Sequence, residues 1–225
     1  MISNAEIKRV KALQSKKFRD ESGLFVVEGE KMVAEALESG LQVEAVYRRD
    51  EIGEQAMARI SSLNTPSPVL AVVRQAAAPD IDEIRDPGNL GTIIRLADWY
   101  GIDAVFCSEG TVELYNPKVV QSTMGAIFRK KVIYCDLNNI FDIFASNGLP
   151  IYGTFLEGED IYRSELSSGG LIVMGNEANG ISPELRSRIS AKLFIPPYPG
   201  NRKTAESLNV AIATAITVSE FRRRR

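Results

Sequence analysis

Histidine is absent from the 225 residues of this chain. Its absence excludes Ser-His-Asp and Cys-His nucleophile systems, histidine acid–base chemistry and most zinc sites, because each of these needs an imidazole. An enzyme with this sequence therefore has to work with asparagine, serine, glutamate, arginine, lysine and backbone amides. No metal site is predicted.

Cysteine is scarce, and long apolar runs are missing. Cys107 and Cys135 belong to no CxxC pair or metal-like cluster, and both sit in apolar, strand-like segments, so we interpret them as reduced core thiols. The longest apolar run, around residues 210–218, is too short and too polar to span a bilayer. The N-terminal residues MISNAEIKRVKAL lack the apolar core of a signal peptide. These absences predict a cytoplasmic protein with no membrane partner.

The chain has no excess of positive charge, with 27 Lys and Arg against 29 Asp and Glu and a net charge of −2. Taken alone, this balance argues mildly against a nucleic-acid partner. However, the chain ends in Arg222–Arg225, and one N-terminal stretch is basic with no acid between its members. That stretch contains Lys8, Arg9, Lys11, Lys16, Lys17 and Arg19. Two interpretations stay open: a solvated protein face, or two basic ends that contact a phosphate backbone.

The first third of the chain has the pattern of a compact α/β unit. Strands are predicted at residues 24–29, 43–49 and 69–74, and helices at 2–13, 30–39 and 54–63. The following stretch, residues 75–83, is poor in periodicity and contains Pro79. We therefore place a domain boundary there.

The strands predicted after residue 85 are short, continuous and rich in valine, isoleucine and phenylalanine. Such strands are typical of a parallel sheet that is buried on both faces and has helices outside it. The predicted strands are 104–108, 131–135, 150–157, 170–175 and 192–197, and the predicted helices are 90–100, 117–128, 138–147, 183–190 and 205–222. Because ligands bind beyond the carboxyl ends of strands in such sheets, the loops after strands are the candidate sites.

The first unusual loop is RDPGNLGTIIRLADWYG, residues 85–101, which lacks both the GxGxxG pattern and the lysine of a phosphate-binding loop. Gly88 permits a tight turn, and we expect Asn89 to cap the helix that follows. Amides exposed at that helix start could meet an anion. Arg95 lies six residues after Asn89. An ordinary capped helix with a surface arginine is the alternative interpretation.

The second loop follows the strand-like segment LIVM and has two glycines and two asparagines within residues 175–180. These residue types accept positive φ and let the backbone approach a ligand closely. A plain strand–turn–helix connection explains Gly180 and the Ser182-Pro183 helix start. It does not explain Glu177 directly after a buried strand.

The third loop runs from the strand-like segment FIPP, residues 194–197, to the entrance of the last helix. Ser207 and Asn209 are polar groups at that entrance, and helix capping is the alternative to a functional role for each. Leu208, Ile212 and Ile216 form a stripe at helical spacing. The stripe belongs either to the core or to an oligomer face.

Taken together and in this order, the three loops resemble those of the SpoU (TrmH-type) RNA 2′-O-ribose methyltransferases of the SPOUT superfamily. The matching segments are DPGNLGTIIR with LADWYG, then IVMGNEANGIS, then IPP with SLNVAIA. The segment KKFRDESGLFVVEGEKMVAEAL resembles the family's small RNA-binding domain. The resemblance implies an L30e-like α/β RNA-binding domain at residues 1–76 and a parallel-sheet SPOUT domain with a deep trefoil knot at residues 77–225. It also implies a homodimer in which both protomers build the site.

The resemblance further implies S-adenosylmethionine as the methyl donor and a ribose 2′-hydroxyl of RNA as the acceptor, with ribosomal RNA favoured over transfer RNA. By resemblance, the residues that contact the donor are Thr154, Gly175, Asn176, Gly180, Ile195, Pro197 and Leu208. The catalytic set is Arg95, Asn89, Glu177, Ser207 and Asn209. The residues expected to grip RNA phosphates are Lys8, Arg9, Lys16, Lys17 and Arg19, with Lys11 beside them. S-adenosylmethionine carries no phosphate, which fits the missing phosphate-binding signatures.

Arg95 matches the family's catalytic arginine. Guanidinium groups hold their proton tightly, so we favour Arg95 as a phosphate clamp and electrostatic activator of the 2′-oxygen. A role as the direct proton acceptor stays open. Glu177 is expected to orient Arg95 or Asn89, while Ser207 and Asn209 position the ribose.

Two other functions stay open at this point. A non-catalytic RNA-binding protein could share the fold, although an inert relative would be free to lose Arg95, Asn89, Glu177 and Asn209. An oxidoreductase with a nucleotide cofactor could use a doubly wound sheet, although the missing GxGxxG pattern and the missing histidine disfavour it. The sequence names neither the RNA nor the nucleotide that is modified.

Overall fold

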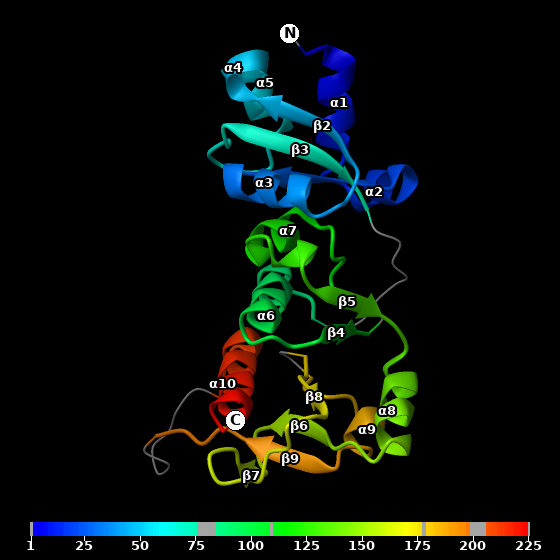
Figure 1. Ribbon diagram of the computed structural model, residues 1–225, viewed down its shortest axis with the longest axis vertical. Helices are drawn as coiled ribbons and strands as arrows, with labels where there is room; N and C mark the ends of the chain where they lie inside the picture. The colour runs from blue at the N-terminus through cyan, green and yellow to red at the C-terminus, as the bar shows by residue number, and fades with distance from the viewer. Residues whose placement is uncertain (1, 76–83, 109, 177–178, 199–205, 225) are drawn as a thin grey trace.

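An antiparallel sheet with helices on both faces forms the N-terminal part of the protein, coloured blue to cyan in the computed structural model (Figure 1). The structure describes residues 2–75, 84–108, 110–176, 179–198 and 206–224. The sheet order is β1 (Leu24–Glu28), β3 (Val69–Arg74), β2 (Val43–Arg48). The helices are α1 (Asn4–Ala12), α2 (Lys16–Ser22), α3 (Glu30–Glu38), α4 (Arg49–Ile52) and α5 (Glu54–Ile60). The predicted strands and helices are confirmed, and α2 and α4 are additions to the predicted set.

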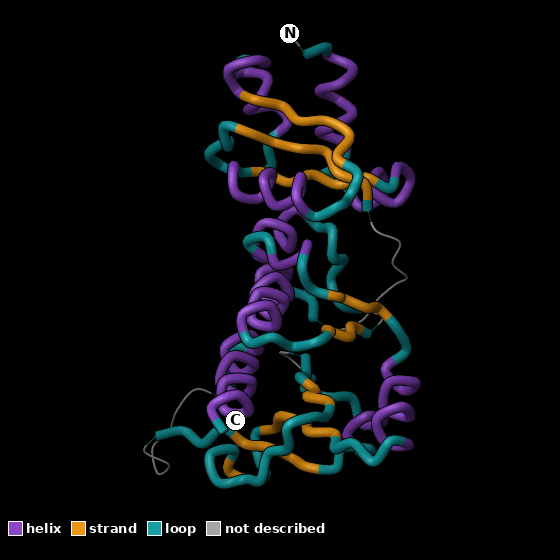
Figure 2. Tube along the Cα trace, in the orientation of Figure 1, coloured by secondary structure: helices purple, strands orange, loops and turns teal. Residues whose placement is uncertain are grey.

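The rest of the chain alternates helices with parallel strands, as predicted for an α/β fold (Figure 2). The first parallel pair is β4 (Ala104–Cys107) with β5 (Lys131–Tyr134). A second parallel sheet has the order β7 (Glu159–Asp160), β9 (Ala191–Phe194), β6 (Ile151–Phe155), β8 (Leu171–Val173). The helices are α6 (Pro87–Trp99), α7 (Pro117–Thr123), α8 (Leu137–Ser146), α9 (Pro183–Arg186) and α10 (Val210–Arg223), with a 3-10 turn at Ala126–Phe128. No helix in the described ranges is long and apolar enough to cross a bilayer.

The expectation that the parallel strands are buried on both faces is wrong for β4 and β5. Residues 104–106 of β4 are half-buried, and Lys131 and Ile133 of β5 are exposed. Over the described residues, the parallel strands divide into two sheets instead of one. A cavity of about 990 Å³ reaches β4 on one side and β8 on the other. The faces of β4 and β8 that line this cavity are therefore not fully covered by helices.

One hydrophobic core joins the N-terminal sheet to the first helices of the C-terminal part. Phe25 of β1 and Val33 of α3 share this core with Leu90 and Ile94 of α6. The ring of Phe25 lies 4.5 Å from the ring of Tyr115, which precedes α7. The predicted domain boundary lies, apart from residue 75, outside the described residues. The segments on its two sides nevertheless bury apolar surface against each other.

Helix α6 is packed closely by two other helices. A Cβ atom at Gly91 would lie 2.4 Å from the Cβ of Ser122 and 2.8 Å from the carbonyl oxygen of Val119, both on α7, so a side chain there would push the helices apart. Helix α10 lies along the same helix. Arg222 of α10 donates hydrogen bonds of 2.7 Å to the carbonyl oxygens of Tyr100 and Gly101 at the end of α6.

Arg19 lies at the junction of the two parts, and its interpretation as an RNA contact is wrong. Its side chain is 2% exposed. The guanidinium donates from Nε to Glu113 at 2.9 Å, donates from Nη2 to the same carboxylate, and donates from Nη1 to the carbonyl oxygen of Leu13 at 2.8 Å. Because the side chain is buried and each nitrogen of the guanidinium already donates to the protein, a phosphate cannot reach it. Arg129 adds a second link by pairing with Glu35 of α3 and Asp98 of α6.

The arginines at the C-terminal end also bind the protein itself. Arg224 donates to the carbonyl oxygen of Ile161 at 3.0 Å and to that of Ser164. The buried carboxylate of Glu220 accepts hydrogen bonds from Arg223 and Arg224. The hydrogen bond from Arg223 is the main reason that the pKa of Glu220 is lowered to about 2. Arg224 therefore fixes the last helix and is not offered to a phosphate backbone.

The two cysteines are free thiols, with Cys107 buried and Cys135 half-buried. Burial raises the pKa of Cys107 to about 12, and it also raises the pKa of Cys135. Both groups are therefore protonated at neutral pH, and protonated thiols are poor nucleophiles. The prediction of a core thiol is confirmed for Cys107.

Loss of Glu113 should destabilise the protein more than loss of Arg19. Glu113→Ala leaves the Arg19 guanidinium buried without its counter-charge, and breaking a buried ion pair in this way costs about 3–5 kcal/mol. Arg19→Ala leaves a carboxylate that is 19% exposed and can be hydrated, so we expect a smaller cost. Urea unfolding of the two variants measures both free energies.

Lys17→Ala is the matched control for this pair. The ion pair of Lys17 with Glu21 is 3.8 Å long and exposed, so its loss should change the unfolding free energy by no more than about 0.5 kcal/mol. Wild-type stability of Glu113→Ala would show that the buried pair does not hold the two parts together.

Candidate active site

The first candidate loop enters α6 through a cap that differs from the predicted one. The carboxylate of Asp86, and not the side chain of Asn89, caps the helix by accepting a 2.8 Å hydrogen bond from the backbone N–H of Asn89. Pro87 occupies the first turn, where its missing N–H costs nothing. The prediction that Asn89 is the cap is therefore wrong. Because Asn89 lies inside the first turn, its side-chain amide can serve a tertiary contact.

That tertiary contact is with the third candidate loop. The side-chain nitrogen of Asn209 donates a 3.0 Å hydrogen bond to the side-chain oxygen of Asn89, across 120 residues of sequence. The oxygen of the Asn209 amide accepts from the backbone N–H groups of Ala211 and Ile212, at 3.0 and 3.3 Å, and so caps α10. One asparagine thus performs the capping role and joins two of the three loops. The structure brings these two predicted catalytic residues together.

Arg95 lies on the exposed surface of α6. It makes no hydrogen bond or ion pair with any residue that the structure describes. It is six positions beyond Asn89, about 9 Å along the helix axis at 1.5 Å per residue. Its guanidinium is therefore available to a ligand, but no described neighbour orients it. Glu177, the predicted orienting carboxylate, lies outside the described residues.

The residues just before α10 are open to solvent. Ser207 is exposed, and the side chain of Leu208 is 49% exposed. Ile212, one helical turn further on, is 52% exposed, and Ile216 is half-buried. The stripe predicted at these positions is therefore not part of the core of this chain. An oligomer face is the alternative that remains.

The second candidate loop closes on itself. The backbones of Asn176 and Gly180 exchange two hydrogen bonds, of 3.0 and 2.9 Å, and Gly180 has a φ of +66°. A Cβ atom at Gly175 would lie 2.5 Å from the carbonyl carbon of Gly180 and 2.6 Å from the nitrogen of Ile181. Gly175 is thus needed to let the loop close. Asn176 is 9% exposed, and its side chain accepts a hydrogen bond from the backbone N–H of Asn179.

This loop borders the cavity of about 990 Å³ between the two parallel sheets. Gly175, Asn176 and Gly180 line it, whereas Thr154, Ile195, Pro197 and Leu208 do not. Thr154 lies next to the lining, because its hydroxyl is 3.7 Å from the sulfur of Met174, which lines the cavity. Ile195 packs on Tyr152 and Leu193 in a small core, and Pro197 is exposed. The cavity lies at the upper end of the range typical of small-molecule sites.

Several polar residues that line the cavity were not among the predicted site residues. Among them are Ser108, Asp136 and Asn138, which follow β4 and β5. The signal was present, since the rule that ligands bind beyond strand ends applies to these strands as well. The loop after β4 has no run of glycines or asparagines, and Asn138-Asn139 after β5 fall in a predicted helix, so these residues did not stand out. The cavity is mainly apolar, and these groups contribute to its polar lining.

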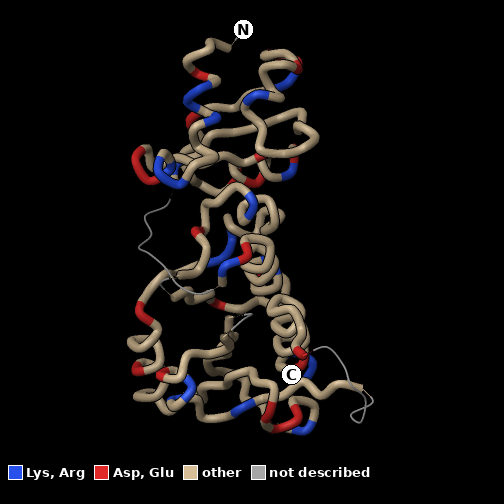
Figure 3. Tube along the Cα trace, turned by 180° about the vertical axis from the view of Figure 1, so that it is seen from behind, with Lys and Arg blue, Asp and Glu red and all other residues tan. Residues whose placement is uncertain are grey.

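Most of the remaining predicted RNA contacts are exposed but have acidic partners. Figure 3 shows basic and acidic residues close together along the N-terminal part of the trace. Arg9 pairs with Glu6 at 2.8 Å. Lys16 pairs with Asp20 at 2.9 Å, and Lys17 with Glu21 at 3.8 Å. Lys8 forms no ion pair with a described residue. The surface of this basic stretch is therefore less positive than its sequence suggests. The helices place acidic residues from just outside the stretch beside its lysines and arginines.

The fold and the three loops are those of a known class of enzyme. The chain belongs to the SpoU rRNA methylase family, whose family model matches residues 81–219. Residues 4–54 match the model of the MRM3-like substrate binding domain. The predicted family is thereby confirmed, together with an α/β fold that has a parallel sheet and an N-terminal substrate-binding domain.

Particular relatives cover nearly the whole chain. The 23S rRNA (guanosine(2553)-2′-O)-methyltransferase RlmP of Bacillus subtilis is 33% identical over 243 aligned positions, which span 97% of this chain and 96% of the relative. A TrmH-family protein from Porphyromonas gingivalis has 35% identity and a TM-score of 0.88, with full coverage of both chains. An AdoMet-bound rRNA methyltransferase from Sinorhizobium meliloti has 29% identity and a TM-score of 0.86 over 100% of this chain and 96% of its own.

The two roles of Asn209 can be separated by substitution. Asn209→Ala removes both the cap and the bond to Asn89, so the unfolding free energy should fall by about 0.5–2 kcal/mol. Asn209→Asp keeps the capping oxygen but cannot donate to Asn89, so the helix should stay stable while Asn89 has to turn its amide and donate in place of accepting. Thermal unfolding and methyl-transfer rates measure the two effects. Wild-type rates for both variants would show that the junction has no functional role.

Proposed function

We propose that this protein transfers the methyl group of S-adenosylmethionine to the 2′-oxygen of a ribose in ribosomal RNA. The observation that carries the proposal is the hydrogen bond between Asn89 and Asn209, which joins two of the three motif loops at one place. Membership of the SpoU rRNA methylase family supports the same reaction. The choice of RNA follows RlmP of Bacillus subtilis and RlmB of Neisseria meningitidis, which are both 23S rRNA methyltransferases.

The reaction is an in-line displacement at the methyl carbon. The ribose 2′-oxygen would form a bond to this carbon as the bond from carbon to the donor sulfur breaks, and the hydroxyl proton would pass to solvent water. The donor would supply an activated methyl group and leave as a neutral thioether. Because the sulfonium is already an activated electrophile, the transfer needs no metal. The protein has to hold the two reacting atoms about 3–3.5 Å apart and stabilise the oxygen as it loses its proton.

Arg95 is our choice for the stabilising group. Its guanidinium carries five donors, which suit a phosphate beside the target ribose and the developing charge on the 2′-oxygen. Ser207 and Asn209 would position the ribose, and Glu177 would orient Arg95 or Asn89. A role for Arg95 as the direct proton acceptor is the alternative mechanism, and it requires a guanidinium that gives up its proton far more easily than usual.

We assign the donor to the side of the cavity that Gly175, Asn176 and Gly180 line, with Met174 beside them. Of the other predicted donor contacts, Thr154 lies next to the lining, whereas Ile195, Pro197 and Leu208 lie outside it. All four stay in the proposal, within a trefoil knot of the C-terminal part. The residues that line the cavity suit such a donor, because apolar surface is combined with a few amide and hydroxyl groups. Calorimetric titration with S-adenosylmethionine, with NAD as the control, tests the assignment.

The proposal also assigns RNA binding and donor binding to different parts of the chain. Residues 1–76 would bind the RNA, with Lys8, Arg9, Lys16 and Lys17 as phosphate contacts, and residues 77–225 would bind the donor. Photo-crosslinking followed by mass spectrometry checks the division. RNA should crosslink within the first range, and a photoreactive S-adenosylmethionine analogue within the second. The reverse pattern would overturn the assignment.

Arg95→Ala should abolish most of the methyl transfer without loss of donor binding. Removal of one preorganised electrostatic group lowers kcat by about 10²–10³-fold. The assay follows labelled methyl transfer to an unmodified 23S rRNA transcript. Arg163→Ala is the matched control, because its side chain is 88% exposed and forms a surface pair with Asp160. A wild-type protein that binds the RNA and transfers no methyl group would instead be a non-catalytic RNA-binding protein.

We further propose that two copies of the chain form a dimer through α6 and the start of α10. Trp99, at the end of α6, is 84% exposed, and Leu208 and Ile212 are also exposed. Large apolar side chains on two packed helices are typical of a covered face. Sedimentation should give twice the chain mass of 24.8 kDa, and Ile212→Asp should shift the mass towards one chain. Tyr198→Asp, at a 96% exposed loop residue, is the control that should leave the dimer intact.

A further inference from the structure

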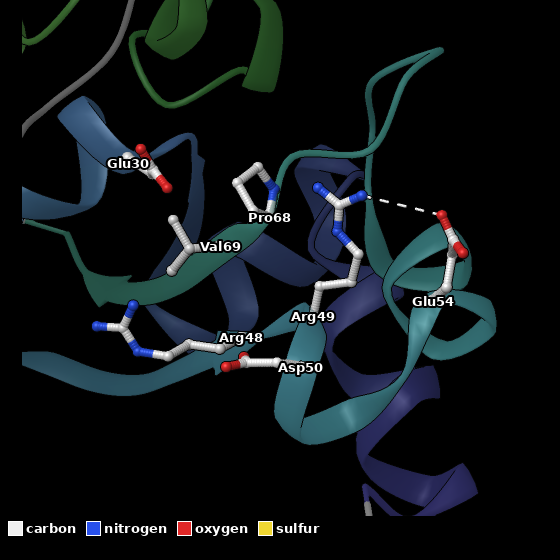
Figure 4. A pocket seen from close by; sticks show the side chains of 7 residues that line it. All are labelled: Glu30, Arg48, Arg49, Asp50, Glu54, Pro68 and Val69. Atoms are coloured by element: carbon white, nitrogen blue, oxygen red, sulfur yellow. Dashed lines mark ion pairs between the residues drawn. The ribbon is translucent and has the colours of Figure 1, made fainter.

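A groove in the N-terminal part is lined by two arginines, Arg48 and Arg49 (Figure 4). It has a volume of about 550 Å³ and lies where β2 runs into α4, beside the start of β3. The residues that line it are Glu30, Arg48, Arg49, Asp50, Glu54, Pro68 and Val69. Of these, residues 30–54 fall within the match to the MRM3-like substrate binding domain.

The backbone around the groove is held firmly. The N–H of Arg49 donates a 2.9 Å hydrogen bond to the carbonyl oxygen of Pro68, and the N–H of Gly53 donates at 2.9 Å to the carbonyl oxygen of Arg49. The N–H of Gly29 donates at 3.0 Å to the carbonyl oxygen of Val69. These bonds tie the ends of three strands and the starts of three helices together. The two arginine side chains therefore project from a fixed base.

The other arginines of residues 2–75 are all engaged. Arg9 pairs with Glu6, Arg19 with Glu113, and Arg74 with Glu44, while Arg59 donates to the side chain of Asn4 at 3.0 Å. Arg48 is exposed and makes no such bond with the residues that the structure describes. Arg49 has one 3.9 Å contact with Glu54, whose side chain is 85% exposed, and such a contact contributes little.

The carboxylates of the groove do not neutralise this pair of arginines. Glu30, Asp50 and Glu54 each lie in the first turn of a helix, where a negative charge is favoured by the helix itself. All three are exposed, so water and salt screen them. A guanidinium group that contacts a phosphate makes two short, parallel hydrogen bonds. Salt weakens these bonds much less than it weakens the attraction to the exposed carboxylates.

We propose that Arg48 and Arg49 form a phosphate-binding site for the substrate RNA, which fixes the RNA on the N-terminal part. The inference rests on the proposed function and adds to it a contact surface apart from the basic residues of α1 and α2. The two guanidinium groups, held by a rigid backbone, bind neighbouring phosphates of one RNA strand. These contacts fix the position of the RNA relative to Arg95. They read no base directly.

The test compares Arg48→Ala/Arg49→Ala with wild type in binding an unmodified 23S rRNA transcript over a range of salt concentrations. The affinity should fall on the order of tenfold or more, and the slope of log K against log salt should fall by about 1 for each phosphate that the variant no longer binds. The KM for RNA should rise, while the affinity for S-adenosylmethionine stays at the wild-type value. Arg48→Lys/Arg49→Lys should keep the salt slope and lose part of the affinity, because lysine keeps the charge without the fork.

Arg59→Ala is the matched control, since it removes one exposed positive charge from the same part of the chain. It should bind RNA like wild type. Wild-type affinity and salt slope in the double alanine variant would overturn the site while leaving the methyltransferase proposal intact. A wild-type protein that binds S-adenosylmethionine but no ribosomal RNA would overturn both.

Discussion

The packing of α6 is the constraint on which the rest of the molecule depends. Its buried face, with Leu90 and Ile94, belongs to the core shared with the N-terminal sheet. Gly91 lets α7 approach to contact distance, and α10 lies along another side. With the helix held in this way, its first turn presents Asn89 to Asn209, and its exposed side presents Arg95. A shift of α6 would therefore move the candidate catalytic residues relative to the surface that would hold the RNA.

Arginine serves two different purposes in this protein, and the partners of each guanidinium separate them. Arg19, Arg222 and Arg224 donate to carboxylates and carbonyl oxygens of the protein, so they join distant segments. The buried guanidinium of Arg19 has to be paired in this way, because an unpaired buried charge is costly. Arg48 and Arg95, in contrast, are exposed and lack such partners among the described residues. The acidic net charge therefore does not prevent binding of an anionic substrate. Such binding depends on the exposed arginines that make no ion pair with a described residue.

The sequence predicted the order and type of the secondary-structure elements well. The spacing of apolar residues indicates a helix or a strand, and glycine and proline indicate where it ends, so both signals are local. It missed α2, since KKFRDES has no apolar period, and it placed the α6 cap on Asn89 when Asp86 supplies it. Both residues are good caps, and local sequence alone does not choose between positions three apart. Burial on both faces was wrong for β4 and β5, because that inference assumed one continuous sheet. The candidate loops were found from their composition, whereas Ser108 and Asp136 were missed because their loops look ordinary.

By itself, the sequence determined the family, the α/β pattern and the chemistry that a chain without histidine can use, because these follow from residue types and their spacing. The tertiary structure decided which residues meet and which charges are already taken. Asn209 reaches Asn89 across 120 residues, and Arg19 is buried against Glu113 although its neighbours in sequence are exposed lysines. These outcomes depend on how helices pack over a shared core. Packing of that kind is a property of the whole chain, and no local stretch of sequence encodes it.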